Sequence, residues 1–300
     1  MNYLYYPGCS LKGTGRAYEE SILSVFKNLG VGLTELEDWN CCGATAYMAI
    51  SELKAFGLSA RNLALAEKQA AKIGSTDMVV PCAACFLGLN KAQRYLKDYP
   101  KVSHQINDAL KSANLSYSGT IRARHPLDVL VNDIGLEKIS QQVRNPLKGL
   151  KVACYYGCQI VRPYADFDDQ HNPIIMDRLI QALGATTIEW PLKTRCCGGS
   201  LTGTVQDVGM RLSYLLLKEA KKRGADVVVT ACPLCQFNLE CYQSPMSSEY
   251  KENINLPVAY FTQLMGRAMN IADKKLGMQR LFVPPKAKVT MAEGGAHVSK

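Results

Sequence analysis

The chain has 300 residues, 47% of them hydrophobic, and a formal charge of +9. This composition is typical of globular proteins, and the positive charge is spread out without the Lys and Arg blocks of a nucleic-acid binder. It suits an anionic ligand or an acidic partner, and it gives no reason to expect nucleic-acid binding.

The amino terminus shows no signal peptide, and no apolar run approaches the roughly 20 residues that cross a bilayer. The longest such run, residues 78–89, is interrupted by Pro81. We therefore expect a cytoplasmic protein without membrane insertion.

The predicted elements of the first half begin with an apolar-periodic helix over residues 20–30, which a glycine closes. A short strand over residues 31–36 leads toward a pair of adjacent cysteines. A buried strand over residues 77–80 then leads into a Cys-x-x-Cys motif that opens the next helix.

The second half repeats this order about 150 residues later. A strand over residues 152–156 precedes a helix over 174–184, a strand over 185–190 and a buried strand over 226–229, which again leads into Cys-x-x-Cys. Residues 126–130 also resemble residues 257–261.

Strands that alternate with helices predict an α/β fold of βαβ units around small parallel sheets. Ligands of such sheets gather at the carboxyl ends of the strands, which is where the cysteines fall. We expect two pseudo-repeated domains, residues 1–145 and 146–270, each with helices flanking its sheet. Residues 271–300, rich in Lys, Pro and Gly, are expected to form an extended tail.

Ten of the twelve cysteines form two copies of one pattern. Each copy has a Gly-Cys, then Cys-Cys-Gly, then Cys-x-x-Cys. The first set is Cys9, Cys41, Cys42, Cys82 and Cys85, and the second set is Cys158, Cys196, Cys197, Cys232 and Cys235.

In a reducing compartment, this many cysteines indicate metal or redox sites more than structural disulfides. Five thiols per set exceed the four ligands of structural zinc or of an ordinary iron–sulfur cubane. Adjacent cysteines reach different metal atoms more easily than one, so a polynuclear iron–sulfur cluster is favoured. A thioredoxin-like dithiol, structural zinc with a spare thiol at one site, and a vicinal disulfide are the alternatives.

Two cysteines remain outside the pattern. Cys154 precedes Cys158 by four residues, but only Cys158 follows a glycine as Cys9 does. We therefore assign Cys158 as the ligand and Cys154 as a small apolar residue of its strand. Cys241, in the helix after Cys235, is expected to be a free thiol.

The pattern resembles the CCG-domain proteins, and over residues 3–270 the chain is similar to the B subunit of heterodisulfide reductase. This resemblance implies two Rossmann-like CCG domains and a non-cubane [4Fe-4S] cluster in each set of five cysteines. It also implies that the two clusters face a cavity in which a mixed disulfide of coenzyme M and coenzyme B is split. The ligands facing the substrate, and so catalytic, would be Cys41, Cys42, Cys196 and Cys197.

By the same resemblance, the ferredoxin-like C subunit of a heterodisulfide reductase, fed by the flavoprotein A subunit, would deliver the electrons. Two clusters beside one S–S bond could each donate one of the two electrons that its reduction needs. Basic residues near the ligands are candidates to bind an anionic substrate, although each could equally be ordinary surface charge. These are Arg195, Arg162, Arg122, Arg124 and His125.

A second hypothesis is an electron-relay protein that passes electrons between a dehydrogenase and a quinone or another carrier. Several relay relatives fuse a ferredoxin motif to the repeats, and this sequence shows none. A third hypothesis is a zinc-stabilised scaffold without redox activity.

Overall fold

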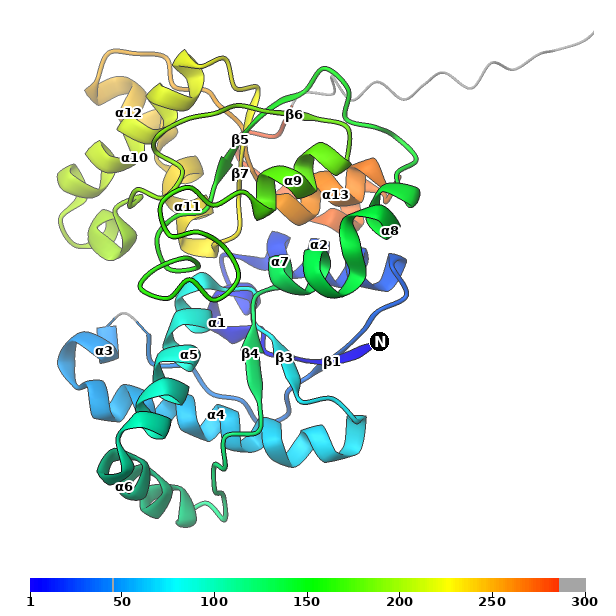
Figure 1. Cartoon of the computed structure of the whole chain (residues 1–300). Helices are drawn as coiled ribbons and strands as arrows, with labels where there is room; N and C mark the ends of the chain where they lie inside the picture. Colours follow the sequence, from blue (N-terminus) through cyan, green and yellow to red (C-terminus); the bar gives the residue numbers. More distant parts are fainter. Residues whose placement is uncertain (45, 286–300) are drawn as a thin grey trace, which may run out of the picture.

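The computed structural model describes residues 1–44 and 46–285. Figure 1 shows the two halves of the chain stacked one above the other. Each half holds a four-stranded sheet, with strand orders β2-β1-β3-β4 and β6-β5-β7-β8. All neighbouring strands are parallel. The repeated order confirms the predicted α/β fold.

The elements of the first half alternate as predicted, although several begin or end a few residues from the expected positions. They are β1 (Asn2–Tyr5), α1 (Gly8–Lys12), α2 (Arg16–Asn28), β2 (Gly32–Glu35), α3 (Ala46–Ile50), α4 (Glu52–Ile73), β3 (Asp77–Val79), α5 (Ala83–Asp98), α6 (Pro100–Lys111), β4 (Arg122–Arg124), α7 (Pro126–Asp128), a π-helical segment η1 (Val129–Gly135) and α8 (Leu136–Gln141).

The second half has fewer helices around its sheet, and an irregular segment follows its first strand. The elements are β5 (Lys151–Tyr155), α9 (Ile175–Ala182), β6 (Thr186–Thr187), the 3-10 helix η2 (Gly199–Gly203), α10 (Gln206–Lys222), β7 (Val227–Thr230), α11 (Pro233–Cys241), α12 (Gln243–Glu249), β8 (Val258–Tyr260) and α13 (Phe261–Ala268).

The central strands of both sheets are buried because helices cover both of their faces, as the apolar runs predicted. All four residues of β7 and all three of β3 are buried. Cys82 and Cys232 are the N-cap residues of α5 and α11, so each Cys-x-x-Cys motif opens a helix directly after a buried strand.

The predicted match between residues 126–130 and 257–261 was wrong. Residues 126–130 lie beyond the end of β4, whereas 257–261 contain β8. Arg124 is paired with Val79 in the sheet and Ala259 with Val229, so the equivalent strands are β4 and β8 themselves.

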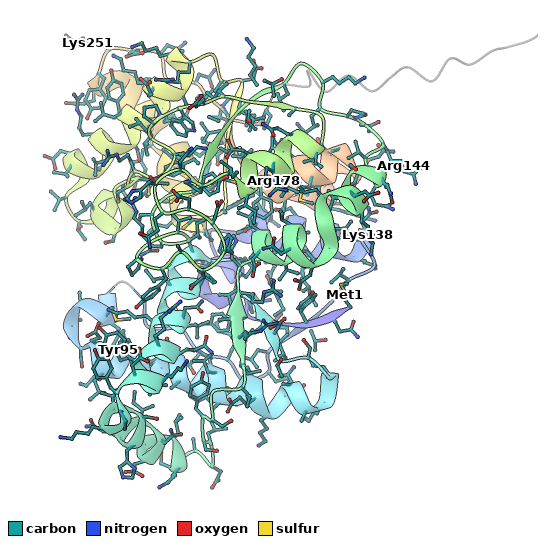
Figure 2. The ribbon with its side chains drawn as sticks, in the orientation of Figure 1. Met1, Tyr95, Lys138, Arg144, Arg178 and Lys251 are labelled. Carbon is teal, nitrogen blue, oxygen red and sulfur yellow. The ribbon has the colours of Figure 1, made fainter. Side chains whose placement is uncertain are left out.

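One continuous hydrophobic core runs through both halves of the molecule, and side chains fill the space between them (Figure 2). The last helix, α13, packs against α2 of the first half. Ser21 and Thr262 share a buried hydrogen bond of 2.6 Å across this contact. The two repeats therefore form one packed unit.

Residues 271–285 correct the expectation of an extended tail. They contain two short 3-10 helices, η3 (Asp273–Leu276) and η4 (Met278–Arg280), and Leu276 is fully buried. Arg280 forms an ion pair with Glu20 of α2 at 2.7 Å. The rest of the predicted tail, residues 286–300, lies outside the described residues. Of the helices that the structure describes, none has both the length and the apolar character required to span a membrane.

Candidate metal centres

The structure brings the five cysteines of the first set together around one tyrosine. The pKa of the Tyr6 phenol is raised by burial and then by the charges of four thiols of this set, Cys85, Cys42, Cys41 and Cys9. The sulfurs of Cys42 and Cys85 are 3.2 Å apart. The fifth thiol, that of Cys82, lies beside Cys85 and contributes to the raised pKa of that thiol.

The second set gathers in the same way around Tyr155, whose pKa is raised by burial and then by Cys235, Cys197, Cys158 and Cys196. The sulfurs of Cys197 and Cys235 are 3.5 Å apart. Cys232 hydrogen-bonds to Cys235 and completes the set.

Each set has an open side and a buried side. Cys9, Cys41 and Cys196 are exposed and Cys158 is partly exposed. The adjacent cysteines diverge as expected, because Cys42 and Cys197 are buried while their neighbours face solvent. The Cys-x-x-Cys thiols form the buried side in both halves, and they are Cys82, Cys85, Cys232 and Cys235.

Glycines leave the space that the sulfurs occupy. A Cβ atom on Gly8 would lie 2.9 Å from the Cys85 sulfur, and one on Gly157 would lie 3.1 Å from the Cys235 sulfur. Both glycines have φ of +67°, a backbone conformation that disfavours other residues. The Gly-Cys motif therefore has the same structural role in both repeats.

Side chains that the sequence analysis missed hold the cysteine loops. Tyr6 and Tyr155 donate to the carbonyls of Asn40 and Arg195, the residues before each Cys-Cys pair, at 2.7 and 2.6 Å. Ser59 donates to the carbonyl of Cys42, and Ser213 to that of Cys197, both at 2.8 Å. The tyrosines precede the Gly-Cys motifs in both halves, a repeated signal that could have identified them.

In each set, hydrogen bonds from neighbouring thiols favour the thiolate form of one cysteine. Hydrogen bonds from Cys41 and then Cys85 lower the pKa of Cys42 to about 4. Hydrogen bonds from Cys158 and then Cys197 lower the pKa of Cys196 to about 2. Because the thiolate is the form that binds metal, both sets are prepared for it.

The two sets meet at their buried sides. Ala83, next to Cys82, lies near Cys232, and its backbone N–H contributes to the lowered pKa of that thiol, about 7, which is caused chiefly by Cys235. A Cβ on Gly15, just before α2, would lie only 2.9 Å from Pro233, so the first half also touches the second Cys-x-x-Cys motif there.

The donor chemistry fits a thiolate-bound metal group, because each set offers five gathered sulfurs and a thiolate. Across residues 1–44 and 46–285, no three Cys, His, Asp or Glu side chains are grouped closely enough to hold a single metal ion, so the fit rests on the kind and number of donors and not on preformed ligand geometry. Cys154 lies apart from the sets, fully buried in β5, and burial raises its pKa. Cys241 is partly exposed in α11, and burial also raises its pKa, to about 11.

Two of the predicted substrate-binding residues lie at the second set. Arg195 lines a cavity of about 500 Å³ together with Cys196, and leucines of α10 form its apolar wall. Arg162 donates a hydrogen bond to the carbonyl of Thr194, and its charge helps to lower the pKa of Cys196.

The structure does not support a substrate-binding role for Arg124 or Arg122. Arg124 forms ion pairs with Asp128, Asp133 and Asp77 at 2.7, 2.6 and 3.2 Å. Arg122 pairs with Asp77 through two hydrogen bonds, of 2.6 and 2.7 Å. Each guanidinium is therefore neutralised within the fold.

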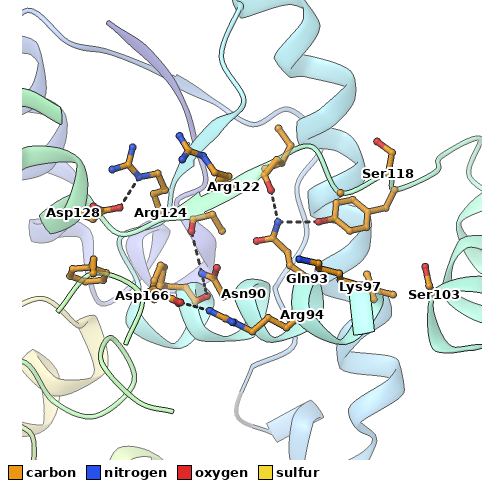
Figure 3. A pocket seen from close by; sticks show the side chains of 17 residues that line it. Asn90, Gln93, Arg94, Lys97, Ser103, Ser118, Arg122, Arg124, Asp128 and Asp166 are labelled. Carbon is orange, nitrogen blue, oxygen red and sulfur yellow. Dashed lines mark hydrogen bonds and ion pairs between the residues drawn. The ribbon is translucent and has the colours of Figure 1, made fainter. Parts of the chain in front are cut away.

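Both arginines line a different cavity of about 670 Å³, between α5 and the edge strand β4 (Figure 3). Its polar wall includes Asn90 and Gln93, which donate to the carbonyls of Ala123 and Ile121. Among the described residues, the lining of this cavity contains no cysteine.

His125 is also unsuited to bind substrate, because its side chain is fully buried. Its Nδ1 accepts the backbone N–H of Leu127 at 3.2 Å, and its ring is stacked on Phe167. Burial lowers its pKa to about 4, so the imidazole is neutral at pH 7. Its place in the structure is that of a helix cap and a core residue.

Comparison with known proteins agrees with this geometry. The cysteine-rich domain family CCG matches residues 3–90 and 152–240. The 8-methylmenaquinol:fumarate reductase membrane anchor subunit of Wolinella succinogenes is 34% identical over 278 residues, which cover 92% of this chain and 95% of that protein.

Two further relatives are B subunits, or B-subunit-like proteins, of heterodisulfide reductases. The heterodisulfide reductase B-subunit-like protein of Archaeoglobus profundus is 29% identical, covering 92% of this chain and 93% of the relative. The B subunit of the ferredoxin:CoB-CoM heterodisulfide reductase of Methanosarcina mazei is 27% identical, with 91% of each chain covered.

Among solved structures, a hypothetical protein from Helicobacter pylori has a TM-score of 0.74 at 16% identity. The match covers 94% of this chain and 52% of that one, and it supports the fold alone. With both repeats matched and a full-length relative above 30% identity, the chain belongs to the cysteine-rich CCG domain family, and the B subunits of heterodisulfide reductases are among its homologues.

Proposed function

We propose that this chain is the iron–sulfur subunit of a heterodisulfide-reductase-like complex and that it reduces a small disulfide or a related sulfur substrate. The observation that carries this proposal is the gathering of two five-cysteine sets within one packed core, with Ala83 of the first half beside Cys232 of the second. The ten ligands would be Cys9, Cys41, Cys42, Cys82 and Cys85 for one centre, and Cys158, Cys196, Cys197, Cys232 and Cys235 for the other.

The reaction requires a pair of redox centres. Reducing R–S–S–R′ to two thiols consumes two electrons and two protons. Two bound non-cubane [4Fe-4S] clusters would supply one electron each. The chain itself would contribute the open sides of both sets, where Cys41 and Cys196 reach the surface, together with the buried sides that exclude water.

Among the predicted substrate-binding residues, Arg195 is the one that faces open space beside a ligand. Its cavity combines the leucine wall with Lys222, and also with Glu219 and with Lys218, which is ion-paired with Glu252 at 3.0 Å. An anionic substrate with an apolar portion would find both complementary surfaces here. We therefore propose Arg195 as the residue that recognises the anionic group.

Electrons would arrive from other proteins, as the chain's homology to components of multi-protein reductases suggests. We propose a ferredoxin-like C subunit of a heterodisulfide reductase as the direct donor and the flavoprotein A subunit as its source.

The relay hypothesis remains a second candidate because of one specific observation. The relative at 34% identity is named as part of an 8-methylmenaquinol:fumarate reductase, which links a quinol to a different acceptor. In that role the same two centres would pass electrons through the complex without reacting with a disulfide.

The two functions can be separated with anaerobically purified protein and its co-purifying partners. Iron, acid-labile sulfide and EPR spectra come first, and then electron transfer to coenzyme M–coenzyme B disulfide and to a menaquinone analogue. Turnover with the disulfide supports the main proposal, and activity with the quinone alone supports the relay. A colourless protein containing zinc and no iron would contradict both.

A further inference from the structure

Three tyrosine hydroxyls in the core have no hydrogen-bond partner among the described residues, and two of them, those of Tyr18 and Tyr260, belong to one stacked pair. The phenol oxygens of Tyr18 and Tyr260 are both inaccessible to solvent, and their side chains are 0% and 1% exposed. Buried hydroxyls are nearly always hydrogen-bonded, so an unpaired one indicates a group that the protein chain does not itself supply.

Each half of the molecule provides one of these tyrosines. Tyr18 lies in the first turn of α2, and Tyr260 is the last residue of β8. Their rings are stacked, with centroids 4.4 Å apart and planes 4° apart. The packing of α13 on α2 brings together residues that are far apart in the sequence.

The pair lies where the two Cys-x-x-Cys motifs meet. Tyr260 is paired with Thr230 across the sheet, two residues before Cys232. Tyr18 lies three residues after Gly15 in the sequence. Gly15 packs against Pro233, the residue that directly follows Cys232. The Thr230 hydroxyl is another buried group without a partner among the residues described, and it lies beside Tyr260 in the sheet.

Both phenols are available as hydrogen-bond donors because their surroundings favour the protonated form. Burial is the largest cause that raises the pKa of Tyr18 and of Tyr260 well above the ordinary value, and the neighbouring cysteines Cys232 and Cys82 contribute to both shifts. Both hydroxyls therefore keep their protons at neutral pH. Cys82 of the first set and Cys232 of the second both act on each phenol, so the pair lies near both candidate centres.

We propose that Tyr18 and Tyr260 form a hydrogen-bonding site for sulfur at the junction of the two centres. Each phenol O–H would donate to a sulfur atom of an iron–sulfur cluster bound there. This inference rests on the proposed function, because it requires iron–sulfur clusters in the two sets. The two tyrosines would thus be positioning residues that hydrogen-bond to the clusters, in addition to the ten cysteine ligands.

The hydrogen bonds have an electrochemical consequence. A reduced cluster carries more negative charge on its sulfurs than an oxidised one, so O–H donors stabilise the reduced form more. Hydrogen bonds to cluster sulfurs are among the factors that set the reduction potential. A shared pair of donors raises the potentials of both centres and keeps them matched for a two-electron reaction.

The test is a redox titration followed by EPR on Tyr18→Phe, Tyr260→Phe and the double variant, with iron and sulfide measured first. We expect wild-type loading and a midpoint potential shifted to more negative values, with the largest shift in the double variant. The control is Tyr214→Phe, which removes a hydroxyl bonded to Glu252 at 2.8 Å while its stacking on Tyr250 remains possible. It should leave the potentials unchanged.

Fully loaded Tyr→Phe variants with wild-type potentials would overturn the inference and leave the proposed function intact. Wild-type protein without iron would instead remove the proposed function. If a variant fails to load, resonance Raman spectra of the wild-type protein in H₂O and D₂O decide. Iron–sulfur bands that shift on deuteration, together with phenol oxygens within hydrogen-bond distance of sulfur in a loaded crystal structure, support the site. A water molecule as the partner of both phenols contradicts it.

Discussion

At the residue scale, Cys154 and Cys158 show how neighbouring cysteines acquire different roles. Cys154 is paired with Val229 in the sheet, and its side chain is completely buried. Cys158 lies beyond the strand end, where its thiol hydrogen-bonds to Cys196. Position relative to the end of β5 therefore separates a core residue from a ligand.

Cys158→Ala should abolish the EPR signal of the second centre and lower the iron content by about half, because one of its five donors is lost. Cys154→Ala is the matched control. It should keep both signals and lose stability by roughly 1–2 kcal/mol through a small core cavity. Loss of the signal in Cys154→Ala with retention in Cys158→Ala would reverse the assignment.

Because the His125 imidazole is buried, we expect the free energy of unfolding to depend on pH. Its folded pKa of about 4 lies below the ordinary value of 6.5, because burial disfavours the charged form. Between these values the unfolded chain binds more protons than the folded one, so stability falls as the pH drops from about 6.5 toward 4. The full effect of one such group is roughly 3 kcal/mol.

We therefore expect His125→Phe to reduce the loss of unfolding free energy between pH 7 and pH 5, measured by urea denaturation. The wild-type protein and the His125→Phe variant are prepared and measured in the same way. Effects of acid on the cysteine sets are then common to both proteins and cancel in the comparison. An unchanged pH profile in the variant would show that His125 does not titrate in this way.

At the element scale, the chain leaves β1 and β5, the first strands of the two halves, through the same local structure. A glycine with positive φ turns the chain after the buried tyrosine and leaves room for the second sulfur of the Cys-x-x-Cys motif. In the first half the turn continues into α1, and in the second half it continues into an irregular segment. The turn is therefore preserved even where the helix is not.

Gly8→Ala should remove the first centre, because its new Cβ would come within 2.9 Å of the Cys85 sulfur. Gly30→Ala is the control. Gly30 has a similar φ of +72°, and the space around it is open. Both variants carry a backbone strain of roughly 1–2 kcal/mol, but only Gly8→Ala should lose iron and the corresponding EPR signal. Equal iron content in the two variants would contradict the proposal that Gly8 leaves the space required by the Cys85 sulfur.

At the scale of the whole molecule, the two repeats share one core and the C-terminal elements cover the first half. The backbone N–H groups of Arg144 and Asn145 both donate to the carbonyl of Ala268, which ties the connection between the halves to α13. An arrangement of this kind favours cooperative unfolding of both halves.

The unfolding of each half can be followed by tryptophan fluorescence, because Trp39 lies in the first half and Trp190 in the second. Trp39→Phe leaves fluorescence from the second half, and Trp190→Phe leaves fluorescence from the first. In each variant we expect the fluorescence transition in urea to coincide with that of far-UV circular dichroism, which reports on both halves. A separate transition for either half would show that the repeats unfold independently.

Much of the fold could be predicted from the sequence because its signals are local. Apolar periodicity located the buried strands β3 and β7 and the helix α9, and spacing located the Cys-x-x-Cys motifs at helix starts. The gathering of each five-cysteine set followed from strand order, since parallel strands bring their carboxyl ends to one edge.

The errors came from contacts between distant residues. Arg124 looked available to a substrate because its partners Asp77 and Asp133 lie outside its own sequence neighbourhood. Residues 271–285 looked extended because their few apolar residues show no periodicity, yet Leu276 fits closely against Gly266.

The sequence by itself determined the repeat, the α/β class and the ten candidate ligands, because spacing and periodicity are properties of short segments. Only the tertiary structure decided that the two sets meet at their buried sides and that Tyr18 and Tyr260, from different halves, stack on each other. The physical reason is that this meeting depends on the packing of α13 against α2, and complementarity between surfaces distant in the chain is not visible in either segment alone.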